Sequence, residues 1–144
     1  MKLKLSVKVP ATYYFNKIVD SSIYDIKQQT GVSLSKDQLQ GYQFKKKIGE
    51  NSYSDFQITK VICNELYAYQ LETPVNSYRV SYQISPLSTE MMNLEYQEEI
   101  TGANKTVSAN NMFTQLLWGW SRKRRFKKMT KEIEKSYQKF KRAK

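Results

Sequence analysis

The first nine residues alternate strictly between apolar and polar side chains. The polar positions hold lysines and a serine, and the apolar positions after Met1 hold Leu3, Leu5, Val7 and Val9. A period of two is typical of a strand with one buried face, so we predict a strand over residues 2–9. Pro10 ends this strand, and proline is common at the first position of a helix.

The period lengthens after Pro10. The next apolar residues recur three and four positions apart, as in an amphipathic helix: Ala11, Tyr14, Phe15, Ile18 and Val19. Asp20, Ser21 or Ser22 is a suitable N-cap for a second helix that carries Ile23 and Ile26, and Gly31 is a suitable stop. We therefore expect two short helices after the first strand.

From Gly41 onward the period returns to two. Alternating apolar residues, many of them tyrosines, mark five segments near residues 42–48, 56–62, 67–71, 78–84 and 92–100. Short polar or proline-containing stretches separate them, among them Gly49 to Ser52 and Asn64-Glu65. Five consecutive strands with short turns predict an antiparallel meander with one solvent-exposed face. With the first strand, the sheet has about six strands, and the fold class is α+β.

A long helix is expected after the polar loop at residues 101–106. On a projection of about 100° per residue, its apolar residues form two stripes on opposite sides. The first stripe is Phe113, Leu116, Leu117 and Trp120, and the second is Phe126, Met129, Ile133, Tyr137 and Phe140. A straight helix cannot press both stripes on one sheet. Either the helix breaks near Gly119 to Ser121, or its second half packs against something else.

Charge is distributed unevenly along the 144 residues, which fit a single domain over residues 1–144. The net charge is +11, yet residues 121–144 alone hold twelve Lys or Arg and two Glu. The remainder of the chain is therefore almost neutral. We predict that residues 122–144 form a basic amphipathic helical extension of the domain.

The composition excludes several kinds of chemistry. There is no histidine, which removes Ser-His-Asp and Cys-His catalysis and the usual zinc sites. The five glycines form no phosphate-binding pattern. We therefore expect no enzyme, no cofactor and no metal. The single cysteine, Cys63, and the absence of a continuous apolar leader at the N-terminus favour the cytoplasm.

The order of predicted elements, together with the opening KLKLSVKVPATYYFNKIVDSSIYDI, resembles the START-like (SRPBCC) helix-grip superfamily, which includes the birch-pollen allergen. The segment MFTQLLWGWSRKRRFKK is similar to an uncharacterised bacterial family within it. This resemblance implies a curved sheet wrapped around the long C-terminal helix, with an apolar cavity between them. Members typically bind lipids, sterols, polyketides or hormones there, so we expect non-covalent binding of a small apolar or amphipathic ligand.

Candidate cavity residues are those on the predicted inward faces. They are Tyr42, Phe44, Lys46, Phe56, Ile58, Lys60, Tyr82, Tyr96, Glu98, Phe113, Leu117 and Trp120. Three of them are charged, and a buried lone charge is costly. Lys46 and Lys60 either reach solvent at strand ends or bind an acidic head group, and Glu98 also points inward by its position. The aromatic residues are equally ordinary core residues.

The basic extension is the second candidate for function. Its predicted interaction residues are Arg122, Lys123, Arg124, Arg125, Lys127, Lys128 and Lys131. Three interpretations stay open at this point. The helix packs on its own domain or on a second copy through the stripe at residues 126–140, with a solvated basic face. Alternatively, its apolar side enters a membrane surface, or its cations bind nucleic acid. An interaction module of this kind is the alternative function.

Overall fold

The computed structural model describes residues 2–49, 52–102 and 105–143, and the side chains of these residues except 48, 49 and 105–122. Six strands, two α-helices and one short 3-10 helix lie in the described ranges. In chain order they are β1 (Lys2–Val7), α1 (Ala11–Thr30), η1 (Lys36–Gln38), β2 (Gln43–Gly49), β3 (Ser52–Ile62), β4 (Leu66–Glu72), β5 (Asn76–Ser88), β6 (Met91–Gly102) and α2 (Lys105–Arg142).

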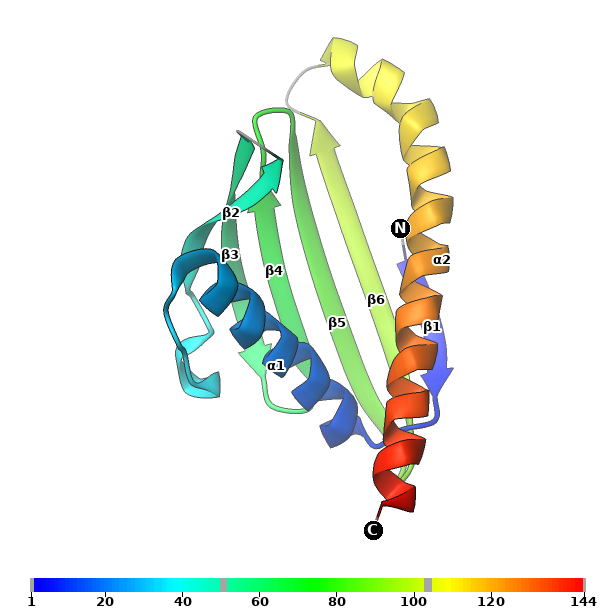
Figure 1. The fold of residues 1–144 in the computed structure, drawn as a ribbon. Coiled ribbons are helices and arrows are strands. Elements are labelled where there is room, and N and C mark those ends of the chain that lie inside the picture. The colour runs from blue at the N-terminus through cyan, green and yellow to red at the C-terminus, as the bar shows by residue number, and fades with distance from the viewer. Residues whose placement is uncertain (1, 50–51, 103–104, 144) are drawn as a thin grey trace.

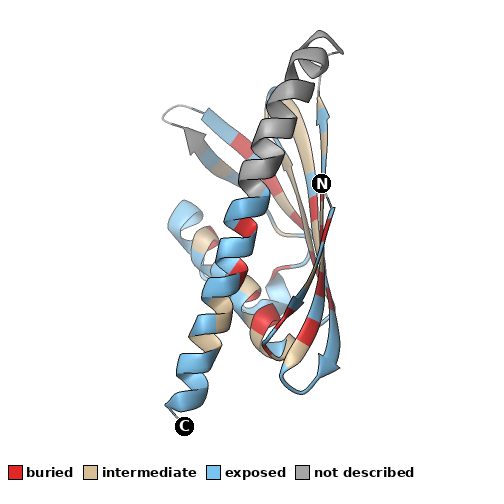
Figure 2. Ribbon diagram, turned by 90° about the vertical axis from the view of Figure 1, so that its right-hand side faces the viewer, coloured by how far each residue is buried: buried red, intermediate tan, exposed pale blue. Residues whose placement is uncertain are grey.

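The strands form one curved antiparallel sheet in the order β1-β6-β5-β4-β3-β2 (Figure 1). Each strand from β2 to β5 pairs with the next along the chain, and β1 closes the other edge by pairing with β6. The predicted meander, the strand number and the α+β class are therefore confirmed. Both helices lie against the same face of the sheet, which we call the inner face (Figures 1 and 2).

A single helix follows the first strand, so the prediction of two short helices is wrong. The apolar stripe continues without a shift from Phe15 and Val19 to Ile26, all of which are buried. Ser21 does not cap a new helix, because its hydroxyl donates to the Lys17 carbonyl one turn earlier at 2.8 Å. The predicted stop is confirmed: Gly31 has a φ of 77° and donates its N–H to the Lys27 carbonyl at 2.8 Å.

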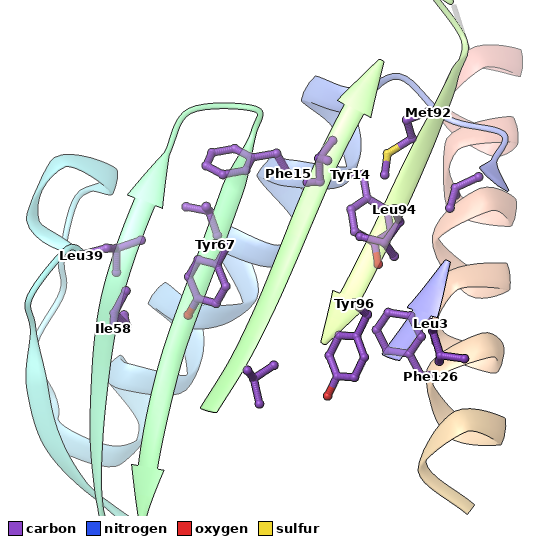
Figure 3. Packing of buried hydrophobic residues seen from close by; sticks show 14 of the residues in the cluster. Leu3, Tyr14, Phe15, Leu39, Ile58, Tyr67, Met92, Leu94, Tyr96 and Phe126 are labelled. Carbon is purple, nitrogen blue, oxygen red and sulfur yellow. The ribbon is translucent and has the colours of Figure 1, made fainter. Parts of the chain in front are cut away.

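The core lies between the inner face and the two helices. Every second residue of the strands points inward, and these residues make up most of the core, including Ile58, Leu94 and Tyr96. Helix α1 adds Tyr14 and Phe15. Figure 3 shows these side chains spread across the core, with Ile58 beside Leu39 and Tyr14 beside Leu94. Alternate strand positions are thereby removed from water, which is the main stabilising contribution for a sheet with one exposed face.

The second half of α2 packs on this core through the second apolar stripe. Phe126 is buried at 7% exposure, and its ring centroid lies 4.3 Å from that of Tyr96 (Figure 3). Ile133 and Tyr137 pack against the core about two and three turns further on. The second stripe therefore contacts the chain's own sheet. The alternative that the second half of the helix packs against something other than the sheet is wrong.

Polar contacts continue the docking of α2 towards its C-terminal end. The Tyr13 hydroxyl of α1 lies 2.7 Å from the Ser136 hydroxyl, and the Tyr13 and Tyr137 rings meet edge to face at 5.0 Å. Lys141 forms an ion pair with Glu90 at the turn between β5 and β6. The helix is continuous from Lys105 to Arg142. The predicted first stripe, Phe113, Leu116, Leu117 and Trp120, lies outside the described side chains.

Candidate functional site

A continuous band of aromatic rings crosses the inner face from one side of the sheet to α2. It forms because directly opposed residues on neighbouring strands are aromatic: Phe44 faces Phe56, and Tyr82 faces both Tyr67 and Tyr96. Successive ring centroids lie between 4.3 and 6.1 Å apart. The band runs through Tyr42, Phe44, Phe56, Tyr69, Tyr67, Tyr82, Tyr96 and Phe126.

A cleft of about 380 Å³ opens over the middle of this band, where α1 and α2 approach the sheet. The sheet supplies its floor with Lys46, Phe56, Tyr67, Tyr69 and Tyr82. One wall comes from α1 with Lys17, Ile18, Ser21, Ser22 and Asp25, and the other comes from α2 with Met129 and Ile133. The volume falls in the lower part of the range typical of small-molecule sites, roughly 300–1,000 Å³.

The α1 side of the cleft carries the charged groups. The Lys46 ammonium lies 2.8 Å from a carboxylate oxygen of Asp25, and both side chains are about one third exposed. The same ammonium lies 5.4 Å from the centre of the Phe56 ring, so it also gains a cation–π contact. Lys17 adds a second cation, 5.2 Å from the Tyr13 ring centre. Two ammonium groups and one carboxylate leave this rim with an excess positive charge.

Neutral hydroxyls line the deeper part of the cleft. The Ser22 and Tyr67 hydroxyl oxygens lie 2.5 Å apart, which joins α1 to β4. Burial raises the pKa of Tyr67 above its ordinary value, partly offset by the Ser22 hydrogen bond, and the nearby Asp25 carboxylate raises it further. Burial raises the pKa of Tyr82 well above its ordinary value. Both phenols are therefore uncharged at neutral pH and offer polar contacts without charge.

Three of the predicted cavity residues, Lys46, Phe56 and Tyr82, line this cleft. Others lie elsewhere on the inner face. Phe44 and Ile58 are buried within the core, and Tyr42 is partly buried beside it. Tyr96 and Glu98 are buried as predicted, and the Tyr96 hydroxyl donates to a Glu98 carboxylate oxygen at 2.9 Å. Phe113, Leu117 and Trp120 lie outside the described side chains.

Lys60 does not point inward, so its assignment to the inner face is wrong. The pairing of β3 with β4 shifts register between Ile58 and Lys60. Such a bulge inserts one extra residue, and all positions beyond it change faces. As a result Lys60 is exposed, while Val61 packs against the core and Ile62 faces solvent. Simple alternation along β3 holds only up to Ile58.

Sequence reasoning missed the residues that the helices contribute to the cleft. Alternation along strands carries no information about which helix side chains reach the sheet. One signal was present on α1, where Lys17, Ser21 and Asp25 recur four residues apart and therefore share one side of the helix. On α2, Met129 and Ile133 belong to the stripe for which the projection gave no partner.

The basic side of α2 is exposed. Among the predicted interaction residues, Lys123, Arg124, Arg125, Lys127, Lys128 and Lys131 are all exposed, and Arg122 lies outside the described side chains. Figure 2 shows this exposed side directed away from the sheet. The second half of α2 therefore packs on its own domain and leaves these cations exposed, and what the basic side contacts stays a prediction.

No group of acidic residues and cysteine in the described ranges is arranged to hold a metal ion. No helix within them is long and apolar enough to cross a membrane. Three further hollows, on the outer face of the described sheet, are lined mainly by polar strand residues.

Solved structures with the same arrangement identify the fold. A START superfamily protein from Mycobacterium smegmatis matches over 94% of this chain and 97% of its own, with a TM-score of 0.67 and 12% identity. A conserved protein from Geobacillus kaustophilus matches over 94% and 95%, with a TM-score of 0.58 and 17% identity. Ara h 8.0201 matches over 94% and 95%, with a TM-score of 0.57 and 12% identity. The chain therefore has the START-like helix-grip fold.

The sequence itself places the chain in a family. It belongs to the family described as a domain of unknown function (DUF3284), whose profile matches residues 1–119. The matched region ends before the run of cations that begins at Arg122. No curated protein matches this sequence.

Proposed function

We propose that this protein binds a small apolar or amphipathic molecule without covalent chemistry, in the cleft between α1, α2 and the sheet. One observation carries the proposal: the cleft has an aromatic floor and a charged rim at one side only. Sites for small molecules are typically apolar with a few well-placed polar groups. The START-like structural neighbours support a ligand-binding role at the level of the fold.

The rim adds a preference for the ligand's polar end. Asp25 already pairs with Lys46, and within the described part of the chain no carboxylate pairs with Lys17. The net positive rim favours an acidic head group such as a carboxylate or phosphate, with its tail over the Phe56 and Tyr82 rings. Lys46, Phe56 and Tyr82 are thus the ligand-binding residues of this proposal.

In this proposal the protein is not an enzyme, and it lies in a reducing compartment. The chain has no histidine, and the Asp25 carboxylate in the cleft is engaged by Lys46, so it is poorly placed to act as a general base. Cys63 is a free, exposed thiol. Exposed free thiols persist where thioredoxin and glutathione keep them reduced, which supports the cytoplasm.

The location of the site is tested with a neutral fluorescent probe, N-phenyl-1-naphthylamine, which brightens in apolar surroundings. Ser21→Trp places a large side chain at the cleft, and we expect it to abolish probe binding. Asp20→Trp is the matched control, because Asp20 is exposed on α1 and does not line the cleft. Equal binding by both variants would show that the probe occupies another site and would overturn the proposal.

The head group is tested by displacing the probe with dodecanoic acid or 1-dodecanol. We expect the acid to compete better in the wild-type protein, and Lys46→Met to reduce its advantage by about fivefold without affecting the alcohol. Lys45→Met is the matched control, since Lys45 directly precedes Lys46 but lies on the outer face beside Asp55. Equal competition by acid and alcohol in the wild type would exclude the acidic preference and leave ligand binding itself in place.

A further inference from the structure

The side of α2 that faces away from the sheet carries a regular row of cations. We call it the outward basic row, and its members are Lys128, Lys131, Lys135, Lys139 and Arg142, all of them exposed. They recur three or four residues apart, so they lie along one line of the helix. At a rise of 1.5 Å per residue the row extends for about 21 Å.

Acidic side chains do little to neutralise this row. On the described part of α2 there are two glutamates. Glu132 lies 3.8 Å from Lys135 in an exposed contact. Glu134 is turned towards β1, where it accepts a hydrogen bond from the Lys8 backbone N–H at 3.3 Å. A long row of nearly unbalanced positive charge is a surface for a polyanion.

The opposite side of the same helix is largely occupied. Phe126 and Thr130 are buried against the sheet at 7% and 4% exposure, and Ile133 and Tyr137 pack against the core. A helix that binds in a membrane interface needs its apolar side free to enter the lipid. Here most of that side packs against the domain, although Met129 and Phe140 are exposed at 38% and 48%, so the surface that α2 offers a partner is mainly its charged side.

The shape of the charged side narrows the choice of polyanion. At about 100° per residue, the cations from Lys123 to Arg125 cover roughly 200° of the helix circumference. A flat lipid surface meets only the outermost part of such an arc. The major groove of duplex DNA is about 12 Å wide and 8.5 Å deep, and its phosphate walls meet both flanks of a helix about 10–12 Å across.

We propose that the outward basic row of α2 binds the phosphate backbone of double-stranded DNA. The row consists of Lys and Arg, and contacts from these residues to phosphates carry no direct sequence information, so the binding is independent of sequence. This surface is separate from the ligand cleft and lies beyond residues 1–119, the part of the chain that the family profile matches. The inference therefore goes beyond the proposed function and does not depend on it.

The test measures the fluorescence anisotropy of a labelled 20-base-pair duplex of arbitrary sequence, titrated with the full chain at 50 mM NaCl. We expect a micromolar dissociation constant, as is usual for sequence-independent binding. The triple variant Lys128→Gln, Lys131→Gln, Lys135→Gln should weaken binding about tenfold or more. It should also lower the slope of log K against log salt by about 2.7, because three phosphate contacts are lost.

The matched control is Lys4→Gln, Lys45→Gln, Lys47→Gln, which removes the same charge from exposed lysines of the sheet. It should bind the duplex almost as tightly as the wild type. Equal weakening by the two triple variants would show that net charge alone causes binding, which overturns the proposal. Circular dichroism checks that each variant is folded, and the salt dependence of the wild type provides a second measurement that needs no variant.

Vesicles that contain phosphatidylglycerol provide the competing partner. At equal concentrations of accessible phosphate, we expect the duplex to be preferred. Preference for the vesicles, with the same loss in the α2 triple variant, would assign the row to an anionic lipid surface and overturn the proposal. Absence of duplex binding at 50 mM NaCl would overturn it as well.

Discussion

The two faces of the sheet are made by the same strands and differ in how their side chains satisfy one another. On the inner face, eight aromatic rings contact each other in series, and the packed helices exclude most water. On the outer face, polar side chains pair across strands, as Lys2 does with Glu95 at 2.8 Å and Gln70 with Gln57 at 3.0 Å. Replacing a strand residue should therefore change the stability of the protein by very different amounts, depending on which face of the sheet the residue lies on.

The largest expected difference concerns buried volume. Ile58 is fully buried on the inner face, whereas the next residue, Thr59, is exposed on the outer face. Ile58→Ala should lower the free energy of unfolding by about 2–5 kcal/mol, because it removes buried methyl groups and leaves a cavity. Thr59→Ala should change it by less than about 0.5 kcal/mol. Urea denaturation of both variants measures the contrast, and similar losses would mean that the two faces are equally buried.

This contrast between faces also explains which parts of the fold were predictable. Where the two faces of a strand differ from each other in polarity, as in β1 and β6, the alternation of apolar and polar residues alone identified the strand and its inward residues. The antiparallel order followed from short turns such as that at Asn64, which has a φ of 61°. The prediction failed at Lys60, where a register shift that leaves no mark in the alternation moved the side chain to the other face.

The helices were predicted less well because their boundaries depend on tertiary contacts. Two adjacent serines in α1 resembled a cap, yet Ser22 faces the sheet and bonds to the Tyr67 hydroxyl. That bond exists only once α1 is docked, so no local pattern indicates it. The cleft shows the same limitation. Its floor was partly predicted from strand positions, whereas its walls depend on where α1 and α2 cross the sheet.

A second expected difference, of intermediate size, concerns the pH dependence of stability. Burial raises the pKa of the Tyr14 phenol on the inner side to about 12, and the neighbouring Thr130 hydroxyl offsets part of the increase. The unfolded chain ionises this phenol near its ordinary value of 10, while the folded protein keeps it neutral. The contribution of the Tyr14 phenol to the free energy of unfolding is thus fully present below pH 10 and is lost as the pH rises towards 12.

Tyr14→Phe removes this titrating group. The free energy of unfolding of the wild type should fall by on the order of 1–2 kcal/mol more than that of the variant between pH 9 and pH 11.5. Tyr24→Phe is the control, because Tyr24 is 66% exposed on the same helix. Guanidinium denaturation at a series of pH values measures the difference. Parallel curves for the wild type and Tyr14→Phe would contradict the assignment of this loss to Tyr14.

Tyr14→Phe also has an expected effect at neutral pH. The hydroxyls of Tyr14 and Thr130 are buried, and neither makes a hydrogen bond of good geometry to another described residue. A buried hydroxyl without a good partner is unfavourable. The variant should therefore be at least as stable as the wild type at pH 7, which makes the loss at high pH a property of the phenol's ionisation rather than of its packing.

The smallest expected difference compares two neighbouring lysines of β2, which form ion pairs on opposite faces. Lys46 reaches Asp25 at 2.8 Å with both side chains about one third exposed, whereas Lys45 reaches Asp55 at 3.3 Å with both mostly exposed. In double-mutant cycles with methionine and asparagine replacements, the inner pair should couple by about 0.5–1 kcal/mol and the outer pair should show no measurable coupling. Solvent screening sets this order, because water separates exposed charges more effectively than half-buried ones.

The salt dependence of these two couplings separates burial from simple geometry. Raising NaCl from 0.05 to 0.5 M should leave most of the inner coupling in place, since the helix packed over Lys46 limits the access of ions. If the inner coupling vanished with salt as completely as an exposed pair does, the rim of the cleft would be as wet as the outer face. An acidic head group would then gain little from Lys46, and the binding energy of any ligand would have to come from the aromatic floor alone.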